Sequence, residues 1–166
     1  SYRCRLVAKE LRAFAPWIPQ EELFAATPPP AAQLFLLSLM VSRRSRRRLP
    51  YKMAFIDVRR AFFRAAATEE VYVELPPELR RPGEDLVGLL RQSLYGTRYA
   101  ARNWQLHLRK DLVGLGFRQA RSSPCVFYHR ALDARLVVHG DDLWLLADEP
   151  GLRQLMPQID AAEGGL

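Results

Sequence analysis

The chain has 166 residues, of which 49% are hydrophobic and 26% charged, so it is long enough for a domain with its own core. We expect no membrane span, because the longest apolar run, residues 34–41, is far too short and is followed by arginines. We also expect no secretory signal peptide, since the first residues are polar and basic.

The net charge of +7 is concentrated in the first third of the chain. Residues 1–50 carry nine Lys and Arg residues against three acidic residues, whereas residues 51–166 carry sixteen against fifteen. Such a basic segment is typical of a surface that binds a polyanion such as nucleic acid, and a solvated basic face explains it equally well.

Two further features concern the origin of the chain and its redox state. The chain begins with Ser1 rather than Met, which indicates a piece of a longer polypeptide. Cys4 and Cys125 lack metal-ligand spacing. Reduced, buried thiols in an intracellular protein are therefore favoured over a disulfide.

The first half of the chain mixes short strands with irregular segments. Alternating polar and apolar residues predict a strand over 2–10, and a Pro-rich segment leads into a helix over 31–41. The run RRSRRR at 43–48 is interpreted as a solvated loop, with contact to template phosphates or a nuclear-import role as alternatives. The remaining predicted elements of this half are a core strand over 51–58, a short helical stretch over 59–67 and a strand over 71–75.

The second half predicts a strand and turn over 86–96 and an amphipathic helix over 99–113, in which Trp104, Leu108 and Leu112 are spaced four apart. Tight turns between the strands that follow make them antiparallel and predict an α+β fold. These later elements are strands over 125–129, 134–139 and 143–147, then a helix from Glu149 that Pro157 interrupts.

Two adjacent aspartates lie between the last two predicted strands. Gly-Asp is common in two-residue hairpin turns, so Gly140 and Asp141 have a structural explanation. Asp142 has none, because Leu-Trp-Leu-Leu follows it directly. Adjacent carboxylates in a partly dry site repel each other unless a cation lies between them, and hard divalent cations prefer oxygen ligands.

A third carboxylate, Asp57, lies at the end of the predicted core strand 51–58. Together with the hairpin pair it could hold two Mg²⁺ ions, an arrangement that serves in-line phosphoryl transfer. Spacing alone leaves three independent structural aspartates as the alternative.

Several segments of the chain resemble, in order and near the expected spacing, those of copia-type retrotransposon reverse transcriptases. The resemblance runs from about Arg5 to Leu155, which is nearly the whole chain. It is carried by the segments 5–9, 22–39, 56–76, 89–104, 115–128 and 136–147.

This resemblance implies a right-hand polymerase core of the α+β class, with fingers and an antiparallel palm sheet packed by helices. Residues 1–50 would be mostly fingers and residues 51–166 palm with some fingers elements, and the chain would stop before the thumb and ribonuclease H regions. The implied activity is an RNA-directed DNA polymerase that acts on an RNA template, a DNA primer and dNTPs with two Mg²⁺ ions, or Mn²⁺ in their place. Integrase and ribonuclease H regions would complete the polyprotein, which would work in cytoplasmic virus-like particles or the nucleus.

The resemblance also implies roles for single residues. It makes Asp57, Asp141 and Asp142 the catalytic metal ligands. Phe62, five residues after the first aspartate, would lie under the incoming sugar and exclude a 2′-hydroxyl, although an ordinary core phenylalanine is the alternative. The other implied substrate-binding residues are Tyr95, Gly96 and Arg98, then Arg3, Arg5 and Lys9 with Arg5 favoured, and Gly140. Gly96 would allow close backbone approach, and Trp104 is expected in the core rather than as a template platform.

The chain departs from the family before the paired aspartates, where His139 and Gly140 replace the usual aromatic-X sequence. We expect Gly140 to remove a primer contact and loosen the turn, and His139 to be an ordinary hydrogen-bonded histidine. Ala101 also stands where the family usually has proline.

Two other functions stay open. One is an inactive or domesticated fragment that binds RNA or DNA. The other is an unrelated two-metal phosphotransferase, which Phe62 and the SLYG block would not explain.

Overall fold

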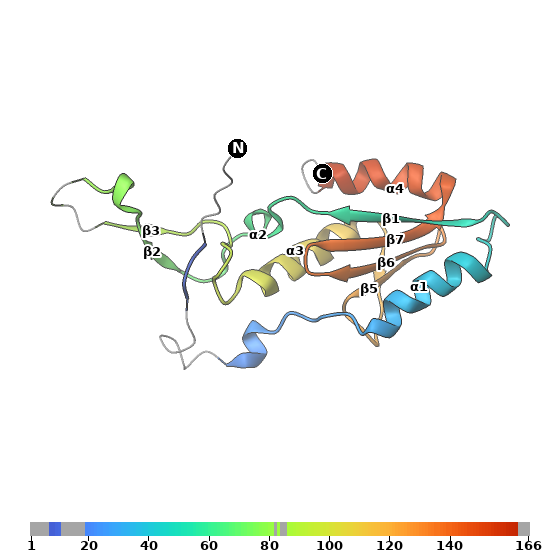
Figure 1. Cartoon of the computed structure of the whole chain (residues 1–166), viewed down its shortest axis with the longest axis horizontal. Coiled ribbons are helices and arrows are strands. Elements are labelled where there is room, and N and C mark those ends of the chain that lie inside the picture. Colours follow the sequence, from blue (N-terminus) through green and yellow to red (C-terminus); the bar gives the residue numbers. More distant parts are fainter. Residues whose placement is uncertain (1–6, 11–18, 82, 84–85, 163–166) are drawn as a thin grey trace. The chain divides into compact units, whose positions relative to one another are not determined.

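The computed structural model of the chain describes residues 7–10, 19–81, 83 and 86–162 (Figure 1). Most of the strand expected over 2–10 lies outside these ranges. The helices are η2 (Gln20–Leu23), α1 (Pro30–Ser42), α2 (Ala61–Arg64), η3 (Pro77–Leu79), α3 (Ala100–Gly114) and α4 (Glu149–Ala162). The strands are β1 (Tyr51–Asp57), β2 (Tyr72–Glu74), β3 (Val87–Leu89), β4 (Arg118–Gln119), β5 (Val126–His129), β6 (Ala134–His139) and β7 (Asp142–Asp148).

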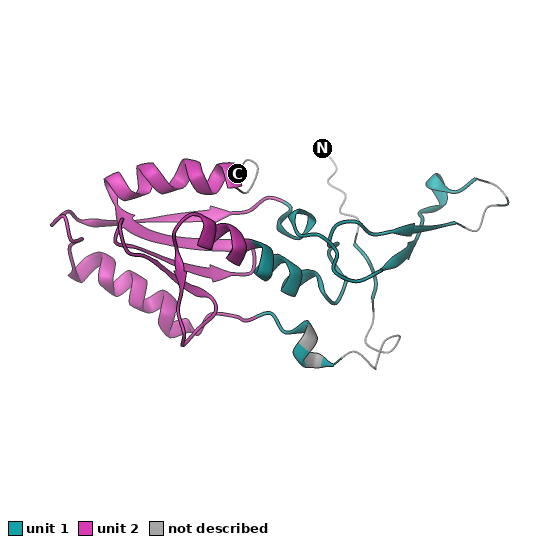
Figure 2. Ribbon diagram, turned by 180° about the vertical axis from the view of Figure 1, so that it is seen from behind, with its two compact units in different colours: residues 1–25, 60–107 teal, residues 26–59, 108–166 magenta. Residues whose placement is uncertain are grey.

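The chain forms two compact units (Figure 2). Unit 1 comprises residues 1–25 and 60–107, and unit 2 comprises residues 26–59 and 108–166. Unit 1 contains a two-stranded antiparallel sheet of β2 and β3, whereas unit 2 contains a five-stranded sheet. Helices and antiparallel sheets together confirm the predicted α+β class. Among the described residues, no helix is both long enough and apolar enough to span a membrane.

The sheet of unit 2 has the strand order β1-β7-β6-β5-β4, and all neighbouring strands are antiparallel. The hairpin of β6 and β7 is local in sequence, and β1, from much earlier in the chain, pairs with β7 along its whole length. This long-range pairing places the end of β1 beside the tip of the hairpin.

Helices α1 and α4 pack against this sheet (Figure 1). On α1, Leu36 is buried in a cluster with Tyr51, Val137 and Leu146 of the sheet. On α4, Leu155 and Ile159 are buried. Burial of these two apolar residues on one helix face stabilises the helix enough to offset the loss of the backbone hydrogen bond that Pro157 cannot donate.

The predicted interruption at Pro157 is therefore wrong, because α4 continues through this residue.

The junction of β7 and α4 depends on Asp148, which is only 1% exposed. One of its carboxylate oxygens, Oδ1, accepts a hydrogen bond of 2.9 Å from the Gly151 N–H in the first turn of α4. The same oxygen accepts a hydrogen bond of 3.1 Å from the guanidinium of Arg47. Asp148 thus caps the helix and ties the arginine run to the sheet.

A second buried carboxylate, Asp133, lies in the turn between β5 and β6. It accepts hydrogen bonds from the Tyr51 hydroxyl at 2.6 Å and the Arg46 backbone N–H at 3.0 Å. Tyr128 and Arg135 also donate to it, both at 3.2 Å. Burial alone would raise the pKa of the Asp133 carboxyl, but these donors and the Arg135 charge lower its pKa below the usual value.

The lowered pKa of Asp133 predicts an acid-dependent loss of stability. A carboxyl whose pKa is depressed by folding contributes stability above its unfolded pKa of about 3.9, and this contribution is lost as the pH falls through the folded value. We expect Asp133→Asn to lower the free energy of unfolding by about 2 kcal/mol at neutral pH, because hydrogen bonds to a charged group are lost. Urea unfolding between pH 7 and pH 2 tests this. The difference between the two proteins should shrink below about pH 4, and a pH-independent difference would contradict the assignment.

Candidate metal centre

The hairpin between β6 and β7 closes in a two-residue turn, Gly140–Asp141. Gly140 has a φ of 65°, whereas Asp141 does not have a positive φ. A positive φ at the first central residue alone is typical of a type II′ turn, in which glycine is favoured at that position. Glycine therefore suits the backbone that presents the two aspartates.

The long-range pairing of β1 brings the third aspartate to this turn. Asp57 is directly opposite Asp142 in the antiparallel register, so the two side chains lie on the same face of the sheet. The backbone N–H of Val58 donates to the carbonyl oxygen of Asp141 at 3.1 Å and fixes the end of β1 against the turn. Carboxylate oxygens of all three aspartates lie within 4.8 Å of one another.

The chemistry of this triad fits a hard divalent cation. Asp57 and Asp142 are exposed and Asp141 is half-buried, so an ion can reach them from solvent. The donors are all carboxylate oxygens, which favour Mg²⁺ or Mn²⁺ over the softer metals that histidine and cysteine select. Within the described ranges, no other group of three such side chains is close enough to share an ion.

Asp57 and Asp142 border an open pocket of about 280 Å³. Its wall includes Phe55 and Trp144, whose rings meet edge to face with centroids 4.9 Å apart. His139 is on β6, where it pairs with Asp142 of β7, and its side chain is exposed. In the described part of the chain this side chain has no hydrogen bond, so the expected hydrogen-bonded histidine is not observed.

The predicted site residues Phe62, Tyr95, Gly96 and Arg98 belong to unit 1. The ring centroids of Phe62 and Tyr95 are 4.5 Å apart, so the expected sugar-contacting phenylalanine packs on the tyrosine of the SLYG block. Gly96 has a φ of 90°, and a side chain there would collide with the backbone of Ala8. The backbone N–H of Arg98 donates to Glu10 at 2.8 Å.

The substrate-binding roles of Phe62, Tyr95, Gly96 and Arg98 stay predictions, as does that of Gly140. Lys9 is exposed. Arg3 and Arg5 lie outside the described residues. Trp104 is 2% exposed, which confirms the expected core position.

Sequence reasoning missed the polar network around Asp133. Its donors come from the start of β1, from β5 and β6, and from the arginine run. The expected element boundaries alone could not reveal it, because its members meet only through the register of β1, β7, β6 and β5. The available signal was an aspartate in a tight turn, with a tyrosine in the strand before it and an arginine in the strand after it.

Comparisons with known proteins agree in pointing to one family. Residues 1–155 match the family model described as "Reverse transcriptase (RNA-dependent DNA polymerase)". The chain is 26% identical over 155 residues to the retrovirus-related Pol polyprotein from transposon TNT 1-94 of Nicotiana tabacum, which covers 91% of this chain and 11% of that polyprotein.

Two relatives from Arabidopsis thaliana are similar. The Pol polyprotein from transposon RE1 is 27% identical and covers 91% of this chain and 10% of that polyprotein. The Pol polyprotein from transposon RE2 is 31% identical and covers 76% of this chain and 8% of that polyprotein. The chain thus spans about a tenth of the length of these curated relatives. No solved structure matches the chain.

Proposed function

Because the chain belongs to the copia-type reverse transcriptase (RNA-dependent DNA polymerase) family, we propose that it carries the centre for RNA-directed DNA synthesis. The reaction would join the α-phosphate of an incoming dNTP to a primer 3′-hydroxyl and release pyrophosphate. The observation that carries this proposal is the triad of Asp57, Asp141 and Asp142, whose oxygens lie within 4.8 Å of one another.

The same proposal assigns polymerase subdomains. The five-stranded sheet of unit 2, which carries the triad, would be the core of the palm. Residues 1–50 would be mostly fingers and residues 51–166 palm with some fingers elements. Helix α1 would be the part of the first segment that belongs to the palm, because it packs on the sheet of unit 2.

Asp57, Asp141 and Asp142 would hold two divalent cations. When bound, such ions would activate the primer 3′-hydroxyl and neutralise charge on the incoming triphosphate. The chain's own contribution is to fix the ligands in advance. Asp57 and Asp142 end paired strands, and the Gly140–Asp141 turn holds the third carboxylate beside them. Ligands on rigid strands lose little conformational entropy when they engage an ion.

The proposed substrates are an RNA template, a DNA primer and dNTPs. The integrase and ribonuclease H regions would come from the rest of the polyprotein. An intracellular site of action is part of the proposal, because it follows from kinship with retrotransposon polyproteins.

Primer extension tests the proposed reaction. The full chain is mixed with a DNA primer on an RNA template, dNTPs and Mg²⁺ or Mn²⁺, and extension should occur only with a divalent cation and only with the templated nucleotide. RNA binding without any incorporation, in Mg²⁺ and in Mn²⁺, would favour the alternative of a nucleic-acid-binding module.

Metal binding can be measured without any activity. We expect Asp57→Asn to weaken Mn²⁺ binding by about tenfold or more, because one charged ligand becomes a neutral amide. Electron paramagnetic resonance of the free Mn²⁺ ion measures this affinity. Glu78→Gln is the matched control, since Glu78 is an exposed carboxylate outside the triad. Equal Mn²⁺ affinity in the Asp57 variant and the wild type would show that the metal does not bind at this site.

A further inference from the structure

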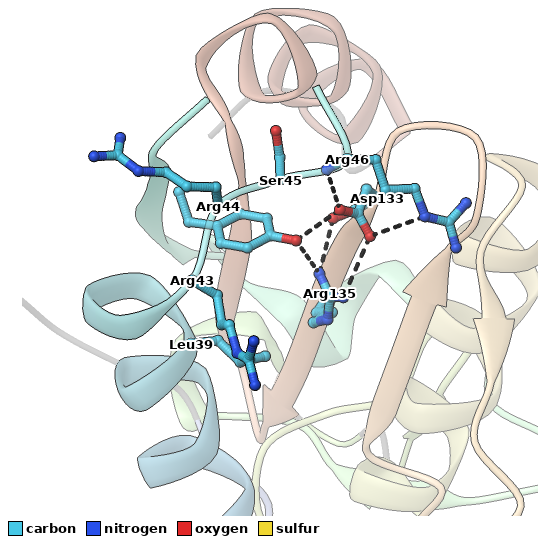
Figure 3. Close-up of a pocket in the computed structure, with 8 residues that line it drawn as sticks. Leu39, Arg43, Arg44, Ser45, Arg46, Asp133 and Arg135 are labelled. Carbon is cyan, nitrogen blue, oxygen red and sulfur yellow. Dashed lines mark hydrogen bonds and ion pairs between the residues drawn. The ribbon is translucent and has the colours of Figure 1, made fainter. Parts of the chain in front are cut away.

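We propose that a pocket lined by arginines, at the other end of the unit 2 sheet, binds the phosphate backbone of nucleic acid independently of the metal centre. This arginine pocket has a volume of about 330 Å³ (Figure 3). The proposal goes beyond the polymerase reaction, since it needs neither metal nor nucleotide transfer. It rests on the proposed function only for the choice of nucleic acid as the polyanion. The pocket is lined by Leu39, Arg43, Arg44, Ser45, Arg46, Tyr51, Asp133 and Arg135.

The arginine run that lines the pocket is a structured loop. Ser45 is buried, and its backbone N–H donates to the carbonyl of Leu49 at 2.8 Å. The backbone N–H of Arg48 donates to the carbonyl of Ser45 at 2.8 Å. Arg44 forms a β-bridge with Pro50. The expected solvated loop is therefore confirmed, since its arginines are exposed, and these backbone contacts hold it in a defined turn.

Two arginines of the run are engaged in fixing this loop. The backbone N–H of Arg46 bonds to Asp133 at 3.0 Å, and its side chain lies 3.8 Å from the same carboxylate. Arg47 pairs with Asp148 at 3.1 Å. Since both carboxylates are buried, these contacts anchor the loop to the sheet at two points.

Two other arginines of the run have no such role. In the part of the chain that the structure describes, the side chains of Arg43 and Arg44 have neither an ion pair nor a hydrogen bond. Both are exposed, and Figure 3 shows them outside the network around Asp133. Guanidinium groups are planar forks that match phosphate oxygens, and a fixed loop lowers the entropy lost when they bind.

The charge of the pocket favours an anionic ligand. Four arginines line it, and Asp133 is its one acidic lining residue. Arg135 is held between the rings of Tyr51 and Tyr128, with its guanidinium carbon 5.3 Å from each ring centroid. The carboxylate is already occupied by its hydrogen-bond donors, so a positive excess faces solvent. An open, positively charged pocket of this kind suits a chain of phosphates, whose counterions are released on binding.

The position of the pocket separates it from the metal centre. Tyr51 and Asp57 are the first and last residues of β1, so six residue steps of about 3.3 Å place the two sites about 20 Å apart. An even number of steps also puts both residues on the same face of the sheet. At about 3.4 Å per nucleotide of one strand, this distance corresponds to about six nucleotides. Contact at the pocket is therefore distinct from contact at the reacting end.

Salt-dependent RNA binding in EDTA tests the proposal, because chelation removes the metal centre from the measurement. The full chain and the double variant Arg43→Ala, Arg44→Ala are titrated onto a labelled single-stranded RNA at several salt concentrations. Each neutralised phosphate of a single strand contributes about 0.7 to the slope of log K against log salt. The variant should therefore lose about 1.4 from the slope, which corresponds to about 25-fold in affinity at 0.1 M salt relative to 1 M salt.

The matched control is Arg118→Ala, Arg121→Ala, which removes the same charge from exposed residues elsewhere in unit 2. The variant Arg43→Lys, Arg44→Lys, which keeps both positive charges, should keep the slope. The proposal is overturned if both alanine variants lose equal affinity, or if neither does. It is also overturned if a mononucleotide displaces RNA near the RNA's own Kd, or if polyglutamate of equal charge competes as well as RNA does. Primer extension by the wild type does not enter this comparison, so failure here leaves the proposed polymerase function untouched.

Discussion

Asp141→Asn should reduce templated nucleotide incorporation by about a thousandfold or more. Asparagine has nearly the same shape as aspartate but carries no charge, so the turn and the strands should stay as they are. The loss falls on cation binding, where the ion contributes several kcal/mol of transition-state stabilisation and about 4 kcal/mol corresponds to a thousandfold in rate. Single-turnover primer extension with saturating Mg²⁺, comparing the variant with the wild type, measures this effect.

Two further comparisons make the Asp141 experiment specific. Asp57→Asn and Asp142→Asn should cause losses of the same order, because the three carboxylates form one cluster. Glu78→Gln, which changes an exposed carboxylate elsewhere, should leave incorporation unchanged. All of these variants should keep the RNA affinity of the wild type in EDTA. Incorporation by the Asp141 variant equal to that of the wild type would overturn the assigned chemistry.

The metal centre shows how far sequence reasoning reached. The adjacent aspartates and Asp57 were identifiable because charge at the ends of apolar strands is unusual and needs compensation. The predicted strand 134–139 coincides with β6, and the predicted strand 143–147 lies within β7, since period and β-propensity are local signals. What brings the triad together is the pairing of Asp57 with Asp142, a long-range register that no local pattern specifies.

The arginine run shows a limit of sequence reasoning. Six residues dominated by arginine are typical of a solvated loop, which their exposure confirms, but composition does not distinguish one arginine from another. The structure separates them, because Arg46 and Arg47 contact the buried carboxylates of Asp133 and Asp148, which are distant in sequence, whereas Arg43 and Arg44 do not. The same reason explains α4, where burial of Leu155 and Ile159 overrides the local effect of Pro157. In both cases tertiary contacts decided what the local pattern could not.

Phe62→Ala should increase the incorporation of ribonucleotides relative to deoxynucleotides by about tenfold to a hundredfold. This expectation rests on the proposed polymerase function, in which the ring lies under the incoming sugar and clashes with a 2′-hydroxyl. Phe62 is half-buried and packs on Tyr95 with ring centroids 4.5 Å apart, so its ring is held by a neighbour. A steric difference of this size in a binding pocket is worth about 1–3 kcal/mol. Competition between one dNTP and its matching rNTP in primer extension measures the ratio.

The neighbouring phenylalanine supplies a matched control for the Phe62 experiment. Phe63 follows on the same short helix, and its ring also contacts Tyr95, at 5.7 Å. Phe63→Ala should therefore disturb the packing around Tyr95 without changing the sugar preference. Relaxed selection in both variants would assign the effect to this packing, and unchanged selection in the Phe62 variant would contradict the steric role. Phe62→Tyr keeps the ring and should retain the preference for deoxynucleotides, which separates the bulk of the ring from the identity of the residue.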